Sequence, residues 1–141
     1  MEKLLHTPEG VRDIYDNECK KKRKVLSKMH HVLSLYSYND IETPTFEFFD
    51  IFNQDKGSAA SNEMYKFFDR DNNTLVLRPD ITPSIARCVA KYYSEEDLPI
   101  RLCYQGDTFL NTHNHQGKSH QITQLGAELI NCLLYTSDAA D

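Results

Sequence analysis

Hydrophobic and polar positions along the chain follow two periods, one typical of helices and one typical of strands. Between residues 16 and 36, apolar side chains recur every three or four positions, which predicts an amphipathic helix with one buried stripe. That stripe consists of Val25, Met29, Val32, Leu33 and Tyr36. A second helix is predicted to begin at Thr82, a suitable N-cap, with Pro83 at its first helical position. Its buried side consists of Ile85, Cys88, Val89 and Tyr92.

Shorter runs between the two helices have strand character. Residues 63–69 and 74–78 surround a polar turn at 70–73, which predicts a hairpin. Residues 38–44 are predicted to be extended, because Pro44 disfavours helical geometry in the residue before it. A dense apolar cluster follows and is interpreted as a core or interface segment. Its members are Phe46, Phe48, Phe49, Ile51 and Phe52.

The most informative stretch is residues 100–130, IRLCYQGDTFLNTHNHQGKSHQITQLGAELI. Two β-rich runs flank a polar connection that contains glycine, which is typical of a long antiparallel hairpin. Side chains four residues apart on a strand point to the same face. Gln124 and Glu128 therefore share a face, and the pattern indicates a ligand platform on an antiparallel sheet.

Composition narrows the class of protein. The chain has 141 residues, enough for at most one domain, with 40% hydrophobic and 26% charged residues, which is typical of a folded globular protein. The net charge of −5 and a pI near 5.6 disfavour extended nucleic-acid binding. No run approaches the roughly 18 apolar residues of a membrane span, and the first residues lack the apolar region of a signal peptide. A cytoplasmic protein without membrane contact is expected.

Metal and anion sites are not favoured by local spacing. The cysteines lie far apart without a C-x-x-C pair, at Cys19, Cys88, Cys103 and Cys132. His113, His115 and His120 are expected in a solvated loop, and the adjacent His30 and His31 point about 100° apart on a helix. The basic run at 20–24 wraps round its helix and is interpreted as solvated. No metal and no cofactor are predicted.

Three segments, taken in order and spacing, carry a family resemblance. They are residues 38–47 (YNDIETPTFE), residues 64–87, which include MYKFFD and LVLRPDIT, and the stretch 100–130. Together they resemble the catalytic domain of class II histidyl-tRNA synthetases over nearly all of residues 5–130. The resemblance implies an α+β fold with a mainly antiparallel sheet flanked by helices. It also implies self-association through the Tyr38–Phe52 region, which looks like the dimer-forming motif of that family.

The resemblance assigns an amino-acid site. Thr82, Gln124 and Glu128 match the residues that hold the α-amino group of histidine, and Asp80 stands where the synthetases have a glutamate. Carboxylates, an amide and a hydroxyl are suitable acceptors for an ammonium group. The alternative is that Asp80 and Thr82 only cap the following helix and that Glu128 is an outward strand residue.

The resemblance is incomplete on the nucleotide side. Leu110 stands where the synthetases have an arginine that clamps the α-phosphate of ATP, and Thr112 stands where they have a glutamate that faces adenine. Asn114 and Ser119 replace basic residues of the loop that grips tRNA. Because a guanidinium neutralises and orients phosphate charge, adenylation without it is disfavoured. The chain is therefore expected to be neither an enzyme nor a tRNA-binding protein.

A paralogous family combines these features, and residues 98–130 resemble it more than any active synthetase. It is the regulatory subunit of ATP phosphoribosyltransferase, which acts in the first step of histidine biosynthesis. The resemblance implies a hetero-oligomer with the short-form catalytic subunit and feedback regulation by free histidine. A divergent histidyl-tRNA synthetase remains the alternative, and a general amino-acid sensor is a third interpretation.

The chain is divided into two parts by its final residues. Residues 1–130 are interpreted as the N-terminal part of a synthetase-like catalytic-type domain that is incomplete at its C-terminus. The tail from 131 to 141, which includes Cys132, has the character of translated sequencing adapter and is expected to be non-native.

Overall fold

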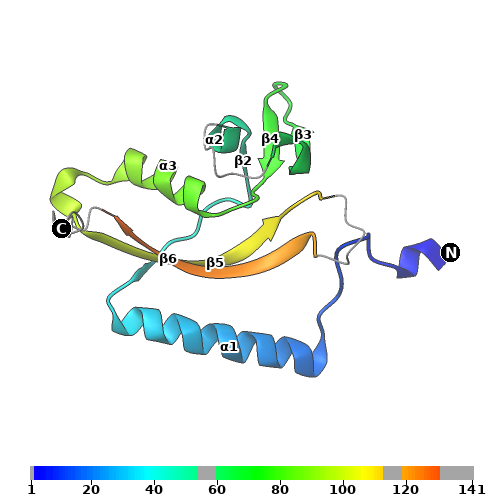
Figure 1. Ribbon diagram of the computed structural model, residues 1–141, viewed down its shortest axis with the longest axis horizontal. Helices are drawn as coiled ribbons and strands as arrows, with labels where there is room; N and C mark the ends of the chain where they lie inside the picture. The colour runs from blue at the N-terminus through cyan, green and yellow to red at the C-terminus, as the bar shows by residue number, and fades with distance from the viewer. Residues whose placement is uncertain (1, 54–59, 113–118, 131–141) are drawn as a thin grey trace, which may run out of the picture.

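The computed structural model describes residues 2–53, 60–112 and 119–130. Within them, one sheet has the strand order β1-β5-β6 and a second has the order β2-β4-β3 (Figure 1). The strands are β1 (Asn39–Asp40), β2 (Phe46–Phe48), β3 (Lys66–Phe68), β4 (Thr74–Leu77), β5 (Ile100–Phe109) and β6 (Gln121–Ile130). The α-helices are α1 (Asp16–Leu35), α2 (Asp50–Asn53) and α3 (Thr82–Tyr92). Short 3-10 turns are found at Glu2–Leu5, Ser61–Glu63 and Glu95–Asp97.

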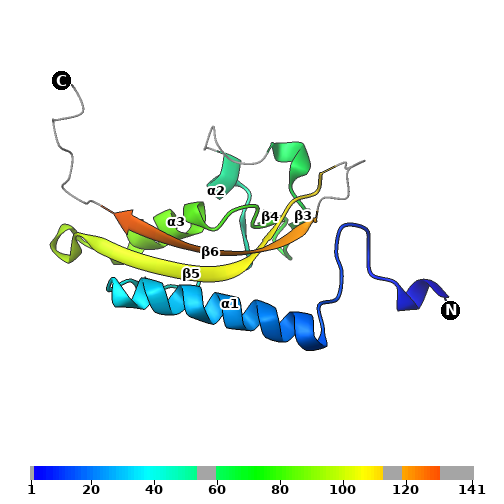
Figure 2. The same ribbon diagram turned by 60° about the horizontal axis from the view of Figure 1, so that its bottom comes forward.

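The antiparallel pair β5–β6 organises the molecule. Its register runs from Ile100 opposite Ile130 to Phe109 opposite Gln121, so every residue of both strands is paired. Residues directly opposite each other share a face of the sheet. Helix α1 covers one face of this pair, and α3 lies on the other face (Figures 1 and 2). The hairpin predicted within residues 100–130 is confirmed.

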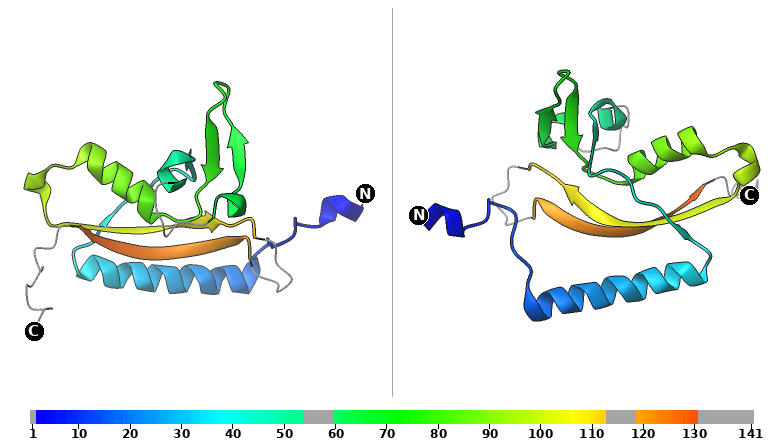
Figure 3. Two further views of the ribbon diagram at one scale, coloured as in Figure 1. Left: turned by 45° about the horizontal axis from the view of Figure 1, so that its top comes forward. Right: turned by 180° about the vertical axis from the view of Figure 1, so that it is seen from behind.

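Two small cores lie on the α3 side of β5–β6. The first joins α3 to the sheet, and its buried members are Ile81, Ile85, Ile100 and Leu102. The second lies in the β2-β4-β3 sheet and contains Phe52, Met64 and Val76. Figure 3 shows this second sheet and α2 beside α3 on the same side of β5–β6.

Helix α1 forms where it is predicted, but the prediction that its apolar stripe is buried is wrong. Leu33 is half-buried, whereas Val25, Met29, Val32 and Tyr36 are exposed. The face beneath α1 presents mainly two long strands, and neighbouring strands lie only about 5 Å apart. That surface is too narrow to cover the apolar side of a 20-residue helix.

Helix α3 also forms at the predicted place, with two differences of detail. Thr82 is not the N-cap: Ile81 occupies that position without a side-chain hydrogen bond, and Thr82 is the first helical residue. Tyr92 is exposed rather than buried, because it lies in the last helical position, where Lys91 Nζ is 4.9 Å from its ring centroid. Ile85 is fully buried as predicted.

The hairpin predicted between residues 63 and 78 is confirmed as β3–β4. Its turn is stabilised by the Asp69 carboxylate, which accepts hydrogen bonds from the backbone N–H groups of Asp71 (2.9 Å) and Asn73 (2.8 Å) and from the Asn73 amide (2.9 Å). Asn72 has a φ of 64°, a left-handed conformation that asparagine tolerates.

The aromatic cluster is divided between core and surface. Phe52 is buried, whereas Phe46 and Phe48 on β2 are exposed. Alternation along β2 instead places Glu47 inside, where it accepts a hydrogen bond from Arg87 Nη2 at 2.6 Å. The core interpretation is therefore confirmed for Phe52, and the interface interpretation stays a prediction for the exposed Phe46 and Phe48.

In the described ranges, α1 is the longest helix, and neither it nor any other helix is long and apolar enough to cross a membrane. His113, Asn114, His115 and the 131–141 tail lie outside the described residues.

Candidate functional site

A polar platform lies on the α3-facing side of β5–β6, and we define it by Asp80, Thr82, Tyr104, Gln124 and Glu128. Tyr104 comes from β5, and Gln124 and Glu128 come from β6. The register places Gln124 opposite Gly106 and Glu128 opposite Leu102, whose side chain packs against α3. The prediction that Gln124 and Glu128 share a face is confirmed.

The start of α3 is tied to the platform by one hydrogen bond. Thr82 Oγ1 donates to Glu128 Oε1 at 2.8 Å, across 46 residues of sequence. Asp80 Oδ1 accepts the N–H of Ile81 at 2.7 Å. Asp80 thus supports the helix start, while Thr82 and Glu128 form a contact that neither a capping role nor an outward strand position explains.

Two glycines of the platform strands make room for the side chains of Arg78 and Tyr104. A Cβ on Gly126 would lie 2.5 Å from Tyr104 Oη, and a Cβ on Gly106 would collide with the Arg78 guanidinium. Both side chains therefore occupy space that any residue other than glycine would fill. The glycines of LGAEL and QGD in the sequence serve close packing across the strands.

Gln124 presents an acceptor that no described residue uses. Its Oε1 is buried and has no hydrogen-bond partner among the described residues. Buried polar atoms are nearly always hydrogen-bonded, so such an atom requires an explanation. A bound donor is one explanation, because the amide oxygen accepts up to two hydrogen bonds.

The electrostatics of the platform favour a cation. Burial raises the pKa of the Tyr104 phenol, and the carboxylates of Glu128 and Asp80 raise it further, against an opposing hydrogen bond from Thr82. Two carboxylates thus act on a half-buried site. An ammonium group placed here would be attracted by both.

Arg78 is a structural part of the site that sequence reasoning missed. It is buried, and its Nε donates to the carbonyl oxygen of Asp107 at 2.9 Å while its Nη1 donates to that of Thr43 at 2.7 Å. Burial lowers its pKa, an effect opposed by the carboxylates of Asp107, Glu42 and Glu47. Arg78 therefore fixes β5 against the segment that precedes β2. Arg78 lies within the segment LVLRPDIT that carries part of the family resemblance, but its structural role depends on contacts with residues distant in sequence.

The predicted nucleotide residues lie at the end of β5. The backbone N–H of Leu110 donates to the carbonyl oxygen of His120 at 2.9 Å, and the Leu110 side chain is half-buried. Thr112 follows two residues later and is also half-buried. The prediction that His120 lies in a solvated loop is wrong. The residue is half-buried, its ring Nδ1 lies 2.9 Å from Tyr65 Oη, and its backbone N–H donates to the carbonyl oxygen of Gly10.

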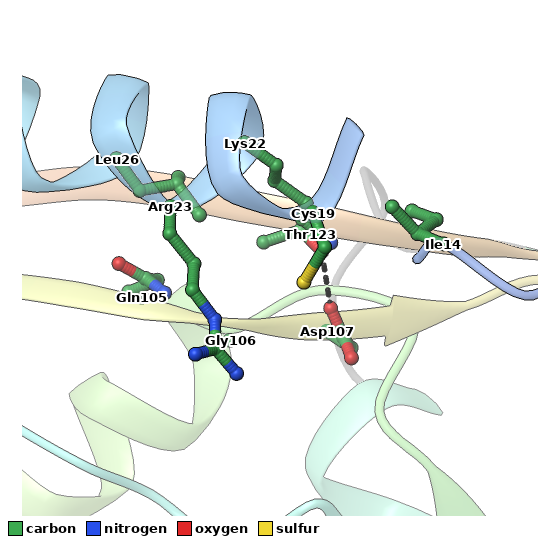
Figure 4. Close-up of a pocket in the computed structure, with 9 residues that line it drawn as sticks. All are labelled: Ile14, Cys19, Lys22, Arg23, Leu26, Gln105, Gly106, Asp107 and Thr123. Atoms are coloured by element: carbon green, nitrogen blue, oxygen red, sulfur yellow. Dashed lines mark hydrogen bonds between the residues drawn. The ribbon is translucent and has the colours of Figure 1, made fainter. Parts of the chain in front are cut away.

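A separate pocket of about 360 Å³ lies on the opposite face, between α1 and the sheet (Figure 4). Lys22 Nζ donates to Thr123 Oγ1 at 2.5 Å, and Thr123 donates to Asp107 at the same distance. Desolvation opposes ionisation of Asp107, but hydrogen bonds from Thr123 and Gln121 outweigh it and lower the pKa of that carboxyl. The prediction of a fully solvated basic run is wrong for Lys22. None of the predicted ligand-binding residues lines this pocket.

Comparison with known proteins identifies the family. A sequence profile described as histidyl-tRNA synthetase matches residues 10–139. The chain belongs to this family.

The most similar proteins include both functional branches of the family. An ATP phosphoribosyltransferase regulatory subunit from Clostridium novyi is 41% identical over 140 residues, which are 99% of this chain and 33% of that protein. A solved ATP phosphoribosyltransferase regulatory subunit/histidyl-tRNA synthetase from Bacillus halodurans has a TM-score of 0.78 and is 35% identical. The match covers 89% of this chain and 32% of the Bacillus halodurans chain. An apo histidyl-tRNA synthetase from S. aureus has a TM-score of 0.71 and is 29% identical, and the match covers 89% of this chain and 33% of the synthetase chain.

These comparisons confirm the predicted class II aminoacyl-tRNA synthetase-like α+β fold. The chain spans about a third of the length of these relatives. The structure of this histidyl-tRNA synthetase family member brings Thr82 and Glu128 into contact and places Gln124 on their face, with Asp80 at the same end of α3. Tyr104 was missed, although strand alternation with Leu102 would have placed it on this face.

Proposed function

We propose that this protein is a non-catalytic regulatory subunit of ATP phosphoribosyltransferase that binds free histidine on the polar platform. The observation that carries the proposal is the buried Oε1 of Gln124, which has no hydrogen-bond partner among the described residues and lies on the same sheet face as the Thr82–Glu128 pair. The names of the Clostridium novyi and Bacillus halodurans relatives support the regulatory assignment. The role in the first step of histidine biosynthesis follows from that assignment.

The platform suits the α-amino group of an amino acid. An ammonium group has three donors and no acceptor. Glu128 supplies a charged acceptor, Gln124 a neutral one and Thr82 a hydroxyl oxygen, while Asp80 adds negative charge nearby. Charge-assisted hydrogen bonds to carboxylates are the stronger type, so Glu128 is expected to contribute most to affinity.

The nucleotide side lacks the group that adenylation would need. Formation of an adenylate develops charge on the α-phosphate, and a preorganised cation stabilises it. Leucine at position 110 supplies no charge. Removing a single preorganised donor typically costs about 3–4 kcal/mol of transition-state stabilisation, so binding without catalysis is the expected outcome.

Regulation would pass from the platform to a catalytic partner. We assign that partner as the short-form catalytic subunit of ATP phosphoribosyltransferase. In this proposal the chain does not bind tRNA. Histidine shifts the equilibrium of the hetero-oligomer only if it binds two conformations with different affinities. Reciprocity then requires that the catalytic subunit change the affinity for histidine by the same factor.

The test uses protein expressed from the complete gene. Calorimetry is expected to show histidine binding that Glu128→Gln weakens at least tenfold, because a charged acceptor is lost while the shape is kept. Glu95→Gln is the matched control, since Glu95 is exposed in the turn before β5. Inhibition of the reconstituted complex by histidine is expected to weaken in parallel.

A pyrophosphate-exchange assay distinguishes the alternatives. The regulatory assignment predicts no histidine-dependent exchange between ATP and pyrophosphate. Exchange at synthetase-like rates would instead establish a divergent histidyl-tRNA synthetase. Binding of several amino acids with similar affinity, without effect on the catalytic subunit, would indicate a general amino-acid sensor.

A further inference from the structure

A second cluster of ligand-type side chains lies on the α1 side of the sheet, on the face opposite the polar platform. It consists of His30 on α1, Asp40 on β1 and Cys103 on β5. One donor atom from each, an imidazole nitrogen, a carboxylate oxygen and a thiol sulfur, lies within 4.8 Å of the other two. The proposed histidine function uses none of these residues.

The fold explains why three residues so distant in sequence meet here. Strands β1 and β5 pair in parallel, and the register sets Asp40 beside Cys103. His30 lies in the C-terminal half of α1, ten residues before Asp40, and the chain reverses direction between them (Figure 1). No local motif brings the three side chains together.

The contacts are already close to those of a metal site. His30 Nε2 lies 2.6 Å from Asp40 Oδ1, and Cys103 Sγ lies 3.6 Å from the same oxygen. Ligands at about 2.0–2.3 Å from a tetrahedral zinc ion are roughly 3.3–3.8 Å apart. The His30–Asp40 pair must open to admit an ion, and both side chains have room to move because Asp40 is 75% and His30 43% exposed.

The set of donor atoms narrows the choice of metal. A thiolate with an imidazole is typical of zinc and disfavours Mg²⁺ and Ca²⁺, which prefer oxygen ligands. The sulfur atom belongs to a residue that is 1% exposed, so strand packing holds it in place. The two mobile ligands face solvent, which provides a route for an ion.

We propose that His30, Asp40 and Cys103 bind a Zn²⁺ ion, with water as the fourth ligand. Coordination replaces the thiol proton of Cys103, which passes to solvent. The ion would join the C-terminal half of α1 to β1 and β5. That connection matters because no residue of α1 is fully buried against the sheet.

The first test is metal binding to the untagged, reduced protein. Co²⁺ is expected to give the intense visible bands of a tetrahedral site and a thiolate-to-cobalt charge-transfer band, both displaced by Zn²⁺. His30→Gln and Asp40→Asn should each weaken Zn²⁺ binding more than tenfold, since even loss of an outer-shell partner costs roughly 10–100-fold. His31→Gln and Cys88→Ser are the matched controls and should change neither result.

The second test separates a site from adventitious surface binding. Zn²⁺ is expected to raise the melting temperature of wild-type protein and of both controls, but not that of His30→Gln. Cys103→Ala should abolish the charge-transfer band. Replacing the buried Cys103 can itself destabilise the fold. The variants of His30 and Asp40, whose side chains are 43% and 75% exposed, therefore test the site without disturbing the core. Octahedral cobalt spectra, or Zn²⁺ affinity unchanged in those two variants, would overturn the proposal.

Discussion

Two residues shape the polar platform because they lack side chains. Gly106 has no side chain at the point where Arg78 crosses β5, and Gly126 has none where Tyr104 lies. The crossing arginine donates to Asp107 on the same strand and to Thr43 before β2. Glycine at position 106 is therefore required by packing.

Gly106→Ala tests this requirement. The added methyl collides with a buried guanidinium whose hydrogen bonds hold it in place, so we expect a loss of about 1–3 kcal/mol in the free energy of unfolding, typical of overpacking. Urea denaturation measures the loss. Gln105→Ala, an exposed neighbour on β5, is the control and should change stability by no more than about 0.5 kcal/mol. Equal stability of the two variants would contradict the packing role.

At the scale of elements, one buried ion pair joins β2 to α3. Glu47 is 7% exposed, and its Oε1 accepts from both Arg87 Nε (3.0 Å) and Arg87 Nη2 (2.6 Å). A buried carboxylate without its partner is strongly destabilising. Because β2 and α3 belong to separate cores, this pair helps to hold the second sheet against the helix.

Arg87→Ala is therefore expected to lower the free energy of unfolding by about 3 kcal/mol. The double variant Glu47→Gln/Arg87→Ala should recover part of this loss, because the buried charge is removed. Chemical denaturation of the two single variants and the double variant forms the required cycle. Strict additivity of the two single losses would show that the pair does not stabilise the junction.

The β3–β4 turn gives stability that depends on pH. The side-chain amide of Asn73 is the main cause that lowers the pKa of Asp69, followed by the backbone N–H groups of Asn73 and Asp71. Since the folded pKa lies below the unfolded value of about 4, the contribution is complete above pH 4. It is lost as the pH falls through the folded pKa.

Asp69→Asn removes that titration. We expect wild-type protein to be more stable than Asp69→Asn at pH 7 and the difference to shrink as the pH falls below about 4. Urea midpoints measured between pH 7 and pH 2 check the trend. Asp71→Asn, at an exposed carboxylate of the same turn, provides the control. A difference that is constant with pH would contradict the role of the Asp69 charge.

For the whole molecule, apolar surface is concentrated in two places. One is α1, where Val25, Met29 and Val32 are among the exposed residues, and the other is β2, where Phe46 and Phe48 are both about half exposed. Strand β2 lies at an edge of its sheet in the described part of the chain. Exposed edge strands with apolar side chains favour association, which supports the predicted self-association through the Tyr38–Phe52 region.

Phe48→Ser is expected to weaken this association. Analytical ultracentrifugation over a range of concentrations should show wild-type protein moving toward dimer and Phe48→Ser remaining monomeric longer. Phe68→Ser, an exposed phenylalanine on the opposite edge strand, is the matched control. Association that both substitutions weaken equally, or that neither changes, would place the interface elsewhere.

Periodicity in the sequence was sufficient for the main elements. The spacing of apolar residues predicted α1 and α3, and β-rich runs on either side of polar turns predicted the β3–β4 hairpin and the β5–β6 pair, because local propensity and backbone geometry fix those patterns. Alternation on β6 also placed Gln124 and Glu128 on one face. Burial was predicted less well, since exposure of Val25 and Phe48 depends on which surface lies opposite.

Long-range pairing decided the rest. Thr82 was predicted as a helix cap from its neighbours, yet its hydroxyl bonds Glu128, 46 residues away. Arg78 over Gly106 and the meeting of His30, Asp40 and Cys103 depend on strand order and register, which local sequence does not specify. By itself the sequence determined the elements, the resemblance to a family and the candidate acceptor residues. Only the tertiary structure decided which residues are in contact, because contacts between residues distant in sequence are set by packing and not by the periodicity of the sequence.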